Sequence, residues 1–190
     1  MIVNLTKIVD IFLGYPLRES PDRLAIGKTA FIQLKNVDVD NGIDWPSVPL
    51  LTLPTNAEKY LLLDGDVIFS ARGLHAYAYP IIEPPHLATC APHFFIFRLK
   101  SKIISPQFLS WQINQKPAQN LINRTKTGAV TPTIRKDDLL NLPIKIPPLA
   151  QQNTILAFYK AANKEKQIYQ GLMNMRQKQI DALAQTLAQT

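Results

Sequence analysis

The stretch Pro147-Pro148-Leu149-Ala150-Gln151-Gln152 divides the chain into two parts of different character. After Pro148 the sequence contains no further proline, and Gly171 is the only glycine before the chain reaches Thr190. Good helix formers fill most of these positions, so we expect one long helix over residues 149–188. Before Pro148, prolines recur throughout the sequence and predict shorter elements.

Apolar side chains recur in this helix at intervals of three or four residues and therefore share one side of it. They are Ile155, Phe158, Tyr159, Ala162, Tyr169, Leu172, Ile180, Leu183 and Leu187. Lys166 and Arg176 interrupt the stripe. A lone helix does not hold such a stripe in water, so we expect a coiled-coil-like helix that pairs with a second copy or with another protein. The alternative is that the helix folds back across its own domain.

The chain has 190 residues, which suits one domain of ordinary size plus an appendage. We expect the domain over residues 1–148 and the helical appendage over residues 149–190. The formal net charge of +7 makes a polyanion the expected partner, with nucleic acid ahead of an anionic membrane surface. Scattered cations and a polar, Gln-rich helix face argue against the membrane.

Cys90 is the only cysteine, so an internal disulfide is excluded and a reducing compartment is indicated. We expect this side chain to fill the core. No basic and apolar signal segment opens the chain, and no apolar run approaches the length of a membrane span. These features predict a soluble protein of the cytoplasm.

The N-terminal part predicts an α+β fold with a short-stranded, mostly antiparallel sheet and flanking helices. Expected strands are 31–35, 48–53, 76–82 and 93–99, and expected helices are 107–114, 117–123 and 136–141. Residues 4–13 fit either a short helix or a strand. Asp64-Gly65 predicts a tight turn between two apolar runs, and Gly73 suggests a close backbone approach.

Patterns typical of enzymes are absent from the sequence: it has no P-loop, no Rossmann glycine pattern and no Gly-x-Ser-x-Gly. His75, His86 and His93 are irregularly spaced and lack the partners of a zinc site, so we interpret them as loop or surface residues. Asp64 and Asp66 are explained by the turn, which leaves little support for a metal-dependent nuclease. We therefore predict no catalytic residue, no metal and no cofactor.

Basic side chains in expected loops are the remaining functional signal, because Arg and Lys neutralise phosphates and read guanine edges. They are Arg18, Lys35, Arg72, Arg98, Lys116, Arg124, Lys126, Arg135 and Lys136. The signal is strongest where cations occur with glycine and hydroxyl groups, in Ser70-Ala71-Arg72-Gly73-Leu74-His75 and Arg124-Thr125-Lys126-Thr127-Gly128. Tyr15 beside Arg18 is a weaker third segment.

Three segments together resemble the target-recognition half of type I restriction-modification specificity subunits. The first is the run from Tyr60 through Leu63-Asp64-Gly65-Asp66 to Ser70-Ala71-Arg72-Gly73. The second leads from Thr127-Gly128-Ala129 through Ile134 to Leu139-Leu140-Asn141-Leu142-Pro143-Ile144. The third is Ile146-Pro147-Pro148-Leu149-Ala150-Gln151-Gln152 with Ile155. Their order and spacing cover most of the chain. Gln151 departs from the family, which commonly has Glu at this place.

The resemblance implies a non-catalytic subunit that binds double-stranded DNA and holds a modification methyltransferase, and in some systems a restriction translocase-nuclease, on a chosen site. Typical members carry two recognition domains and two long antiparallel helices, whereas this sequence has one of each. We therefore expect a homodimer that reads a split palindrome. The alternatives are a regulatory fragment that pairs with a full-length subunit or the methyltransferase, a stand-alone nuclease, and a protein that binds other proteins without touching nucleic acid.

The resemblance also points to candidate DNA contacts. We expect Arg72, Lys126 and Thr127 first, followed by Tyr15, Arg18, Lys35, His75 and Arg124.

Overall fold

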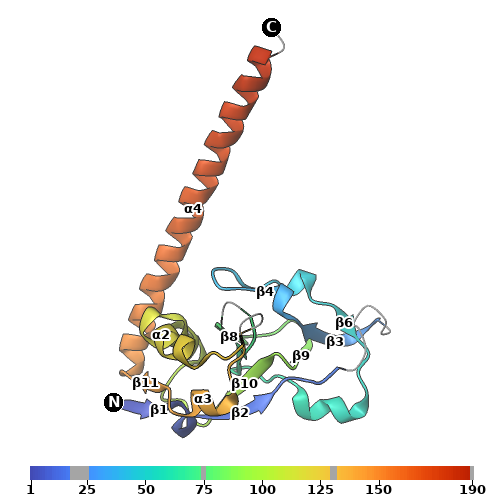
Figure 1. Ribbon diagram of the computed structural model, residues 1–190, viewed down its shortest axis with the longest axis vertical. Coiled ribbons are helices and arrows are strands. Elements are labelled where there is room, and N and C mark those ends of the chain that lie inside the picture. The colour runs from blue at the N-terminus through green and yellow to red at the C-terminus, as the bar shows by residue number, and fades with distance from the viewer. Residues whose placement is uncertain (18–25, 74–75, 129–131, 189–190) are drawn as a thin grey trace. The chain divides into compact units, whose positions relative to one another are not determined.

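A computed structural model describes residues 1–17, 26–73, 76–128 and 132–188 (Figure 1). The chain forms two compact units, Met1–Gln152 and Asn153–Thr190. The strands are β1 (Ile2–Asn4), β2 (Val9–Leu13), β3 (Ile26–Ile32), β4 (Val37–Asp38), β5 (Gly42–Ile43), β6 (Leu50–Leu51), β7 (Val67–Ser70), β8 (Ala78–Pro80), β9 (Leu87–Cys90), β10 (Phe94–Leu99) and β11 (Pro143–Lys145). The helices are α1 (Pro106–Asn114), α2 (Lys116–Thr125), α3 (Lys136–Leu140), α4 (Leu149–Ala188) and the short 3-10 turns η1 (Leu5–Lys7), η3 (Leu34–Asn36), η4 (Trp45–Ser47) and η5 (Thr55–Tyr60).

The first unit is built around a four-stranded antiparallel sheet in the order β2-β10-β7-β8 (Figure 1). Central β10 is almost fully buried, and Phe97 stacks on Phe69 of neighbouring β7 with 5.6 Å between the ring centroids. A second sheet has the order β6-β3-β9, in which β3 and β9 run parallel. The predicted α+β class with mostly antiparallel pairing is therefore confirmed.

The predicted α-helices are found at their expected places among the described residues. The expected helices 107–114, 117–123 and 136–141 correspond to α1, α2 and α3, and the long helix α4 begins at Leu149, directly after the two prolines. Strand predictions are less accurate. Residues 4–13, which fit either a helix or a strand, form the short turn η1 followed by β2. The expected strands 31–35 and 48–53 are found only as the end of β3 and as the two-residue β6. β9 was not predicted.

The predicted turn at Asp64-Gly65 exists, but it does not join two strands. Gly65 has a φ of +88°, and the run before it forms η5 and an extended segment instead of a strand paired with β7. Asp66 is buried and its Oδ2 accepts a hydrogen bond of 2.8 Å from the Leu63 N–H. This side-chain contact closes the turn locally, while β7 takes β8 and β10 as its neighbours.

Glycine is required at position 14 because two backbone segments meet there. A Cβ at Gly14 would overlap the backbone of Ala91 and Cys90. The close packing lets the Gly14 N–H donate to the Phe94 carbonyl at 3.0 Å and the Tyr15 N–H donate to the Cys90 carbonyl at 2.7 Å. The suggestion of a close approach at Gly73 was wrong: a Cβ there would have open space, and its φ of +99° is the reason for glycine.

The core of the first unit contains Cys90, as the sequence analysis expected. Burial raises the pKa of its thiol well above the ordinary value. No helix within the described residues is long and apolar enough to cross a membrane.

Gln152 fixes the first turn of α4 within the first unit. Its side chain is fully buried, its Oε1 accepts a hydrogen bond of 2.9 Å from the Ser105 N–H, and its Nε2 donates to the carbonyls of Ile103 at 2.8 Å and Pro147 at 2.9 Å. All three partners are backbone groups, so the amide joins chain segments through hydrogen bonds that buried backbone groups require. Gln152 is thus a structural clamp between the helix start and the loop before α1.

Candidate nucleic-acid interface

The two basic segments singled out in the sequence lie on either side of Thr133. Arg72 and Thr127 each form an antiparallel bridge with Thr133. The Thr127 and Thr133 backbones exchange hydrogen bonds of 3.0 and 2.8 Å, and the Gly73 N–H donates to the Pro132 carbonyl at 3.0 Å. We call residues 71–73, 126–128 and 132–134 the three-segment ladder.

The ladder places cations and hydroxyl groups together at the surface. The Arg72 and Thr127 side chains are exposed, and Lys126 is half-buried, which lowers the pKa of its ammonium group. Exposed guanidinium, ammonium and hydroxyl groups are the donors that contact DNA phosphates and base edges. Three of the expected contacts therefore occur in one small region.

His93 joins this region and was missed in the sequence. Its carbonyl accepts a hydrogen bond of 2.8 Å from the Ala71 N–H, next to Arg72. Partial burial, followed by the nearby positive charge of Arg72, lowers the pKa of the imidazole. A neutral imidazole offers one donor and one acceptor, which suits a base edge. No sequence signal marks His93, because its position depends on the register in which Phe94 of β10 faces Ser70 of β7.

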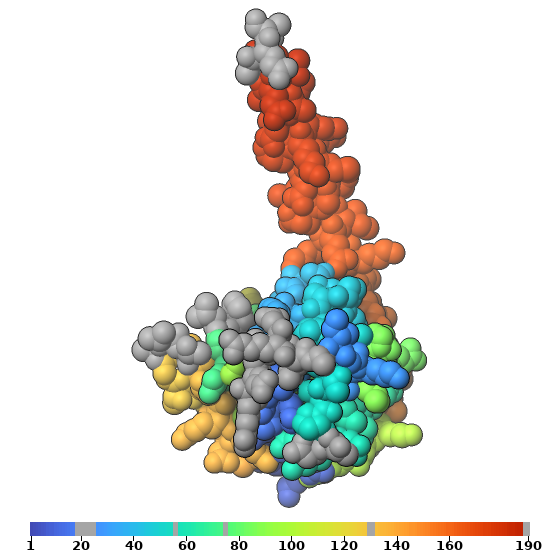
Figure 2. Space-filling view, turned by 90° about the vertical axis from the view of Figure 1, so that its right-hand side faces the viewer, coloured from blue at the N-terminus to red at the C-terminus, as the bar shows by residue number. Residues whose placement is uncertain are grey.

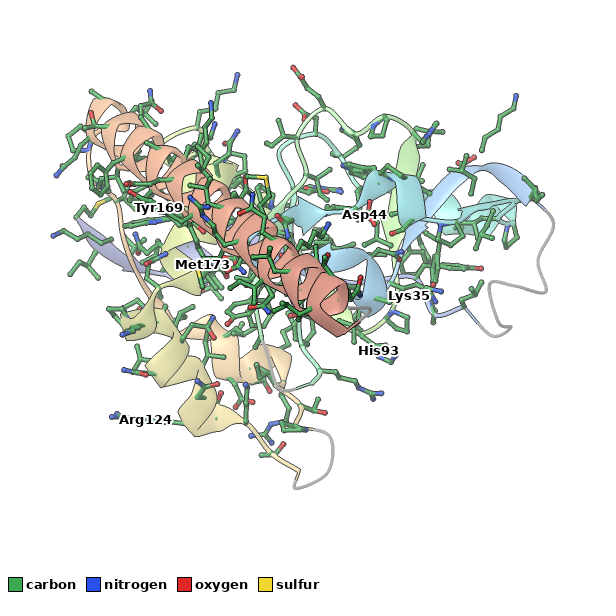
Figure 3. All side chains as sticks on the ribbon, turned by 90° about the horizontal axis from the view of Figure 1, so that it is seen from above. Lys35, Asp44, His93, Arg124, Tyr169 and Met173 are labelled. Carbon is green, nitrogen blue, oxygen red and sulfur yellow. The ribbon has the colours of Figure 1, made fainter. Side chains whose placement is uncertain are left out.

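Lys35 lies near His93 in the folded chain. Both Lys35 and His93 line a shallow pocket of about 460 Å³ (Figure 3). The remaining lining residues are Leu17, Phe31, Gln33, Leu34, Ala91 and Pro92. The pocket is lined mostly by apolar side chains, together with a cation and an imidazole. It extends the candidate interface beyond the three-segment ladder.

The other expected contacts are Arg124, Tyr15, Arg18 and His75, and none of them belongs to the three-segment ladder. Arg124 is exposed in the last turn of α2 and points away from the domain (Figure 3). Tyr15 is half-buried, with its ring edge-on to Tyr60 at 5.3 Å between centroids, so its ring takes part in packing. Arg18 and His75 lie outside the described residues.

Three of the nine basic residues that we assigned to loops serve structural roles instead. Arg98 lies in β10 and not in a loop, and it forms an ion pair with the buried Asp66 whose hydrogen bonds raise the pKa of the guanidinium. Arg135 pairs with Asp138 at 3.3 Å, and Lys136 Nζ donates to the Ile11 carbonyl at 2.8 Å. Sequence alone could not separate these residues, because each partner comes from the fold or from helix geometry.

No group of three or more His, Cys, Asp or Glu side chains that could hold a metal ion occurs in the described part of the chain. The side chains gathered at the site are cations, hydroxyls and an imidazole, which suit the binding of an anion.

Comparison with solved structures shows the same fold in specificity subunits. The HsdS subunit from Thermoanaerobacter tengcongensis aligns with a TM-score of 0.69 and 21% identity over 98% of this chain and 47% of that one. The S subunit of a type I restriction-modification system from M. genitalium aligns with a TM-score of 0.55 and 16% identity over 84% of this chain and 39% of that one.

A third structure, described as the structural basis of complex assembly and conformational transition of the type I R-M system, aligns with a TM-score of 0.71 and 20% identity over 98% of this chain and 47% of that one. This chain thus spans about half the length of the solved structures, or less. No curated protein matches its sequence. The family model for the type I restriction modification DNA specificity domain matches residues 28–174. The chain therefore belongs to the family of type I restriction-modification DNA specificity domains.

Proposed function

We propose that this chain recognises a specific double-stranded DNA sequence for a type I restriction-modification system, as a binding subunit and not as an enzyme. The observation that carries the proposal is the three-segment ladder, which gathers Arg72, Lys126 and Thr127. His93 and Lys35 extend the same surface. Phosphate contacts from the cations supply affinity and position, and side chains that reach base edges supply specificity.

We further propose that two copies pair through α4. Most of the apolar stripe of this helix is open to solvent, with Phe158 79% and Leu183 67% exposed, whereas Ile155 and Tyr159 are half-buried. Figure 2 shows side chains standing out along the helix, drawn in orange to red. A helix pair buries such a stripe, and burial of apolar surface is the main driving force for association.

A homodimer of this kind reads a two-fold symmetric site. Each recognition domain contacts one half-site, and the paired helices fix the distance between the halves. The dimer then positions a modification methyltransferase, with or without a restriction translocase-nuclease, on the bound sequence. A chain that stays monomeric and joins a full-length specificity subunit would instead be a regulatory fragment.

Replacing the ladder cations should weaken DNA binding in two distinguishable ways. If Lys126 contacts phosphate, Lys126→Ala weakens binding to all sequences and lowers the slope of log affinity against log salt by about one. If Arg72 reads a base, Arg72→Ala relaxes specificity at one position at a cost of about 1–3 kcal/mol. Fluorescence anisotropy on a selected site, on mismatched sites and across a salt series measures both effects.

The matched control for these substitutions is Lys145→Ala, which removes one exposed charge on β11 outside the candidate interface. It should leave the specificity and the salt slope close to those of the unmodified chain. The interface assignment is wrong if neither ladder substitution changes affinity or its salt dependence.

Lengthening α4 should change the preferred DNA spacer. Insertion of four residues, about one helical turn, next to Gly171 lengthens an antiparallel pair by about 6 Å. This length equals about two base-pair steps of the duplex. Selection from a random DNA library should therefore return half-sites about two base pairs further apart. An unchanged spacer would mean that the helix joins the copies without setting their distance.

A further inference from the structure

The charged side chains Glu165, Lys166 and Arg176 lie along the apolar stripe of α4, and Glu165 and Arg176 carry opposite charges. Glu165 follows Ala162 by three residues and precedes Tyr169 by four, and Arg176 follows Leu172 by four. At about 3.6 residues per turn, both therefore fall on the line of the apolar side chains. Both are exposed, and the Arg176 guanidinium donates to Gln179 Oε1 at 3.1 Å within the helix.

Glu165 and Arg176 cannot pair within one helix. They are separated by about three turns, or roughly 16 Å along the axis. In a helix pair, the stripe becomes the seam, and a charge buried in a seam is costly unless it meets an opposite charge. Both charges therefore need partners from the opposing helix.

Three pairs of positions along the stripe are symmetric about one peptide bond. Glu165 and Arg176 lie equally far on either side of the Gln170–Gly171 bond, and the same holds for Tyr169 with Leu172 and for Phe158 with Leu183. In an antiparallel pair centred on this bond, each residue therefore faces its counterpart.

Other arrangements of two α4 helices are less favourable than the centred antiparallel pair. A parallel pair in register sets Glu165 against Glu165 and Arg176 against Arg176, and like charges at close range disfavour that pairing. An antiparallel pair shifted by one turn leaves all four charges opposite other residues. Of these arrangements, the centred antiparallel pair is the one that sets Glu165 and Arg176 of each copy opposite each other.

We propose that two copies of α4 pair antiparallel about the Gln170–Gly171 peptide bond, with Glu165 of each copy facing Arg176 of the other. This register rests on the antiparallel homodimer proposed above and adds its alignment. The apolar layers then join Phe158 to Leu183 and Tyr169 to Leu172 of the second copy. Glu165 and Arg176 select the pairing, while the apolar side chains supply its strength.

Charge exchange tests the predicted contact. Glu165→Arg alone and Arg176→Glu alone should each raise the dimer dissociation constant by about tenfold or more. The double variant restores both pairs and should dimerise close to the level of the unmodified chain. The matched control, Lys178→Glu, makes the same charge change on the opposite side of the helix and should change dimerisation little. A double variant weaker than both single variants overturns the register.

Cysteine cross-linking tests direction and alignment independently. Because Cys90 is buried, thiols introduced at Phe158 and Leu183 are the exposed ones among the described residues. The double variant Phe158→Cys/Leu183→Cys should form a covalent dimer under mild oxidation, whereas each single variant should not.

The possible results separate the register from the dimer itself. Cross-linking of either single variant to itself shows a parallel pair and overturns the proposal. A dimer in which the double variant forms no intermolecular cross-link also overturns it. Sedimentation of the unmodified chain as a monomer at high concentration would overturn the homodimer, and the register with it.

Discussion

Replacing Arg98 by methionine is expected to lower the free energy of unfolding by about 3 kcal/mol. Arg98 Nε and Nη2 donate to the two carboxylate oxygens of Asp66 at 2.9 and 2.7 Å, and Nη2 also donates to the Leu61 carbonyl at 3.1 Å. Asp66 is only 2% exposed, so the substitution leaves a buried carboxylate without its cation. The Arg98 side chain itself is 34% exposed, and solvent screening keeps the effect at the lower end of the range for buried pairs.

Urea denaturation followed by circular dichroism measures this loss. The matched control is Arg124→Met, which removes an exposed guanidinium from α2 and should change stability by less than about 0.5 kcal/mol. The double variant Arg98→Met/Asp66→Asn should lose less than the two single losses combined, because the second change removes the unpaired charge. A loss below about 1 kcal/mol for Arg98→Met would show that the pair is unimportant for the fold.

Gln152→Glu is expected to destabilise the first unit by about 3 kcal/mol. The substitution replaces an amide nitrogen that donates to the Ile103 and Pro147 carbonyls by an oxygen that faces them. The site is fully buried, so the carboxylate must either stay charged beside two carbonyl oxygens or take up a proton. The lost stability should be partly regained at acidic pH, because a protonated carboxyl can donate one of the two hydrogen bonds.

Gln151 provides a matched control for this substitution. It precedes Gln152 in the same helical turn and is exposed, so Gln151→Glu makes the same chemical change in water. A negative charge near a helix N-terminus should be neutral or stabilise by about 0.3–1 kcal/mol. Denaturation curves of the two variants at neutral and acidic pH compare both effects. Equal stability of the two variants would contradict the clamp assigned to Gln152.

The helices could be predicted because their signals are local. Prolines at 106, 117 and 147–148 mark helix starts, and a proline-free sequence rich in helix formers predicts α4. Strands depend on partners that are distant in the sequence. The run before Asp64 has the composition of a strand, but β8 and β10 lie on both sides of β7. β9 became a strand because β3 lies beside it.

The candidate interface was predicted in part for the same reason. Glycine and hydroxyl groups beside cations pointed to residues 70–75 and 124–128, but their meeting at Thr133 was invisible in the sequence. His93 was added by the register of β10, and it shares a pocket with Lys35, which the sequence had already singled out. Arg98, one of the basic residues assigned to loops, pairs instead with a buried carboxylate that the fold supplies.

The sequence by itself therefore determined the long helix after Pro147-Pro148, its apolar stripe and the family of the chain, since these depend on residues a few positions apart. The tertiary structure alone decided which cations remain exposed and how Gln152 holds the start of that helix. These outcomes depend on backbone groups and side chains that are brought together from distant parts of the sequence. Such contacts are fixed by long-range strand pairing and packing, which local patterns do not encode.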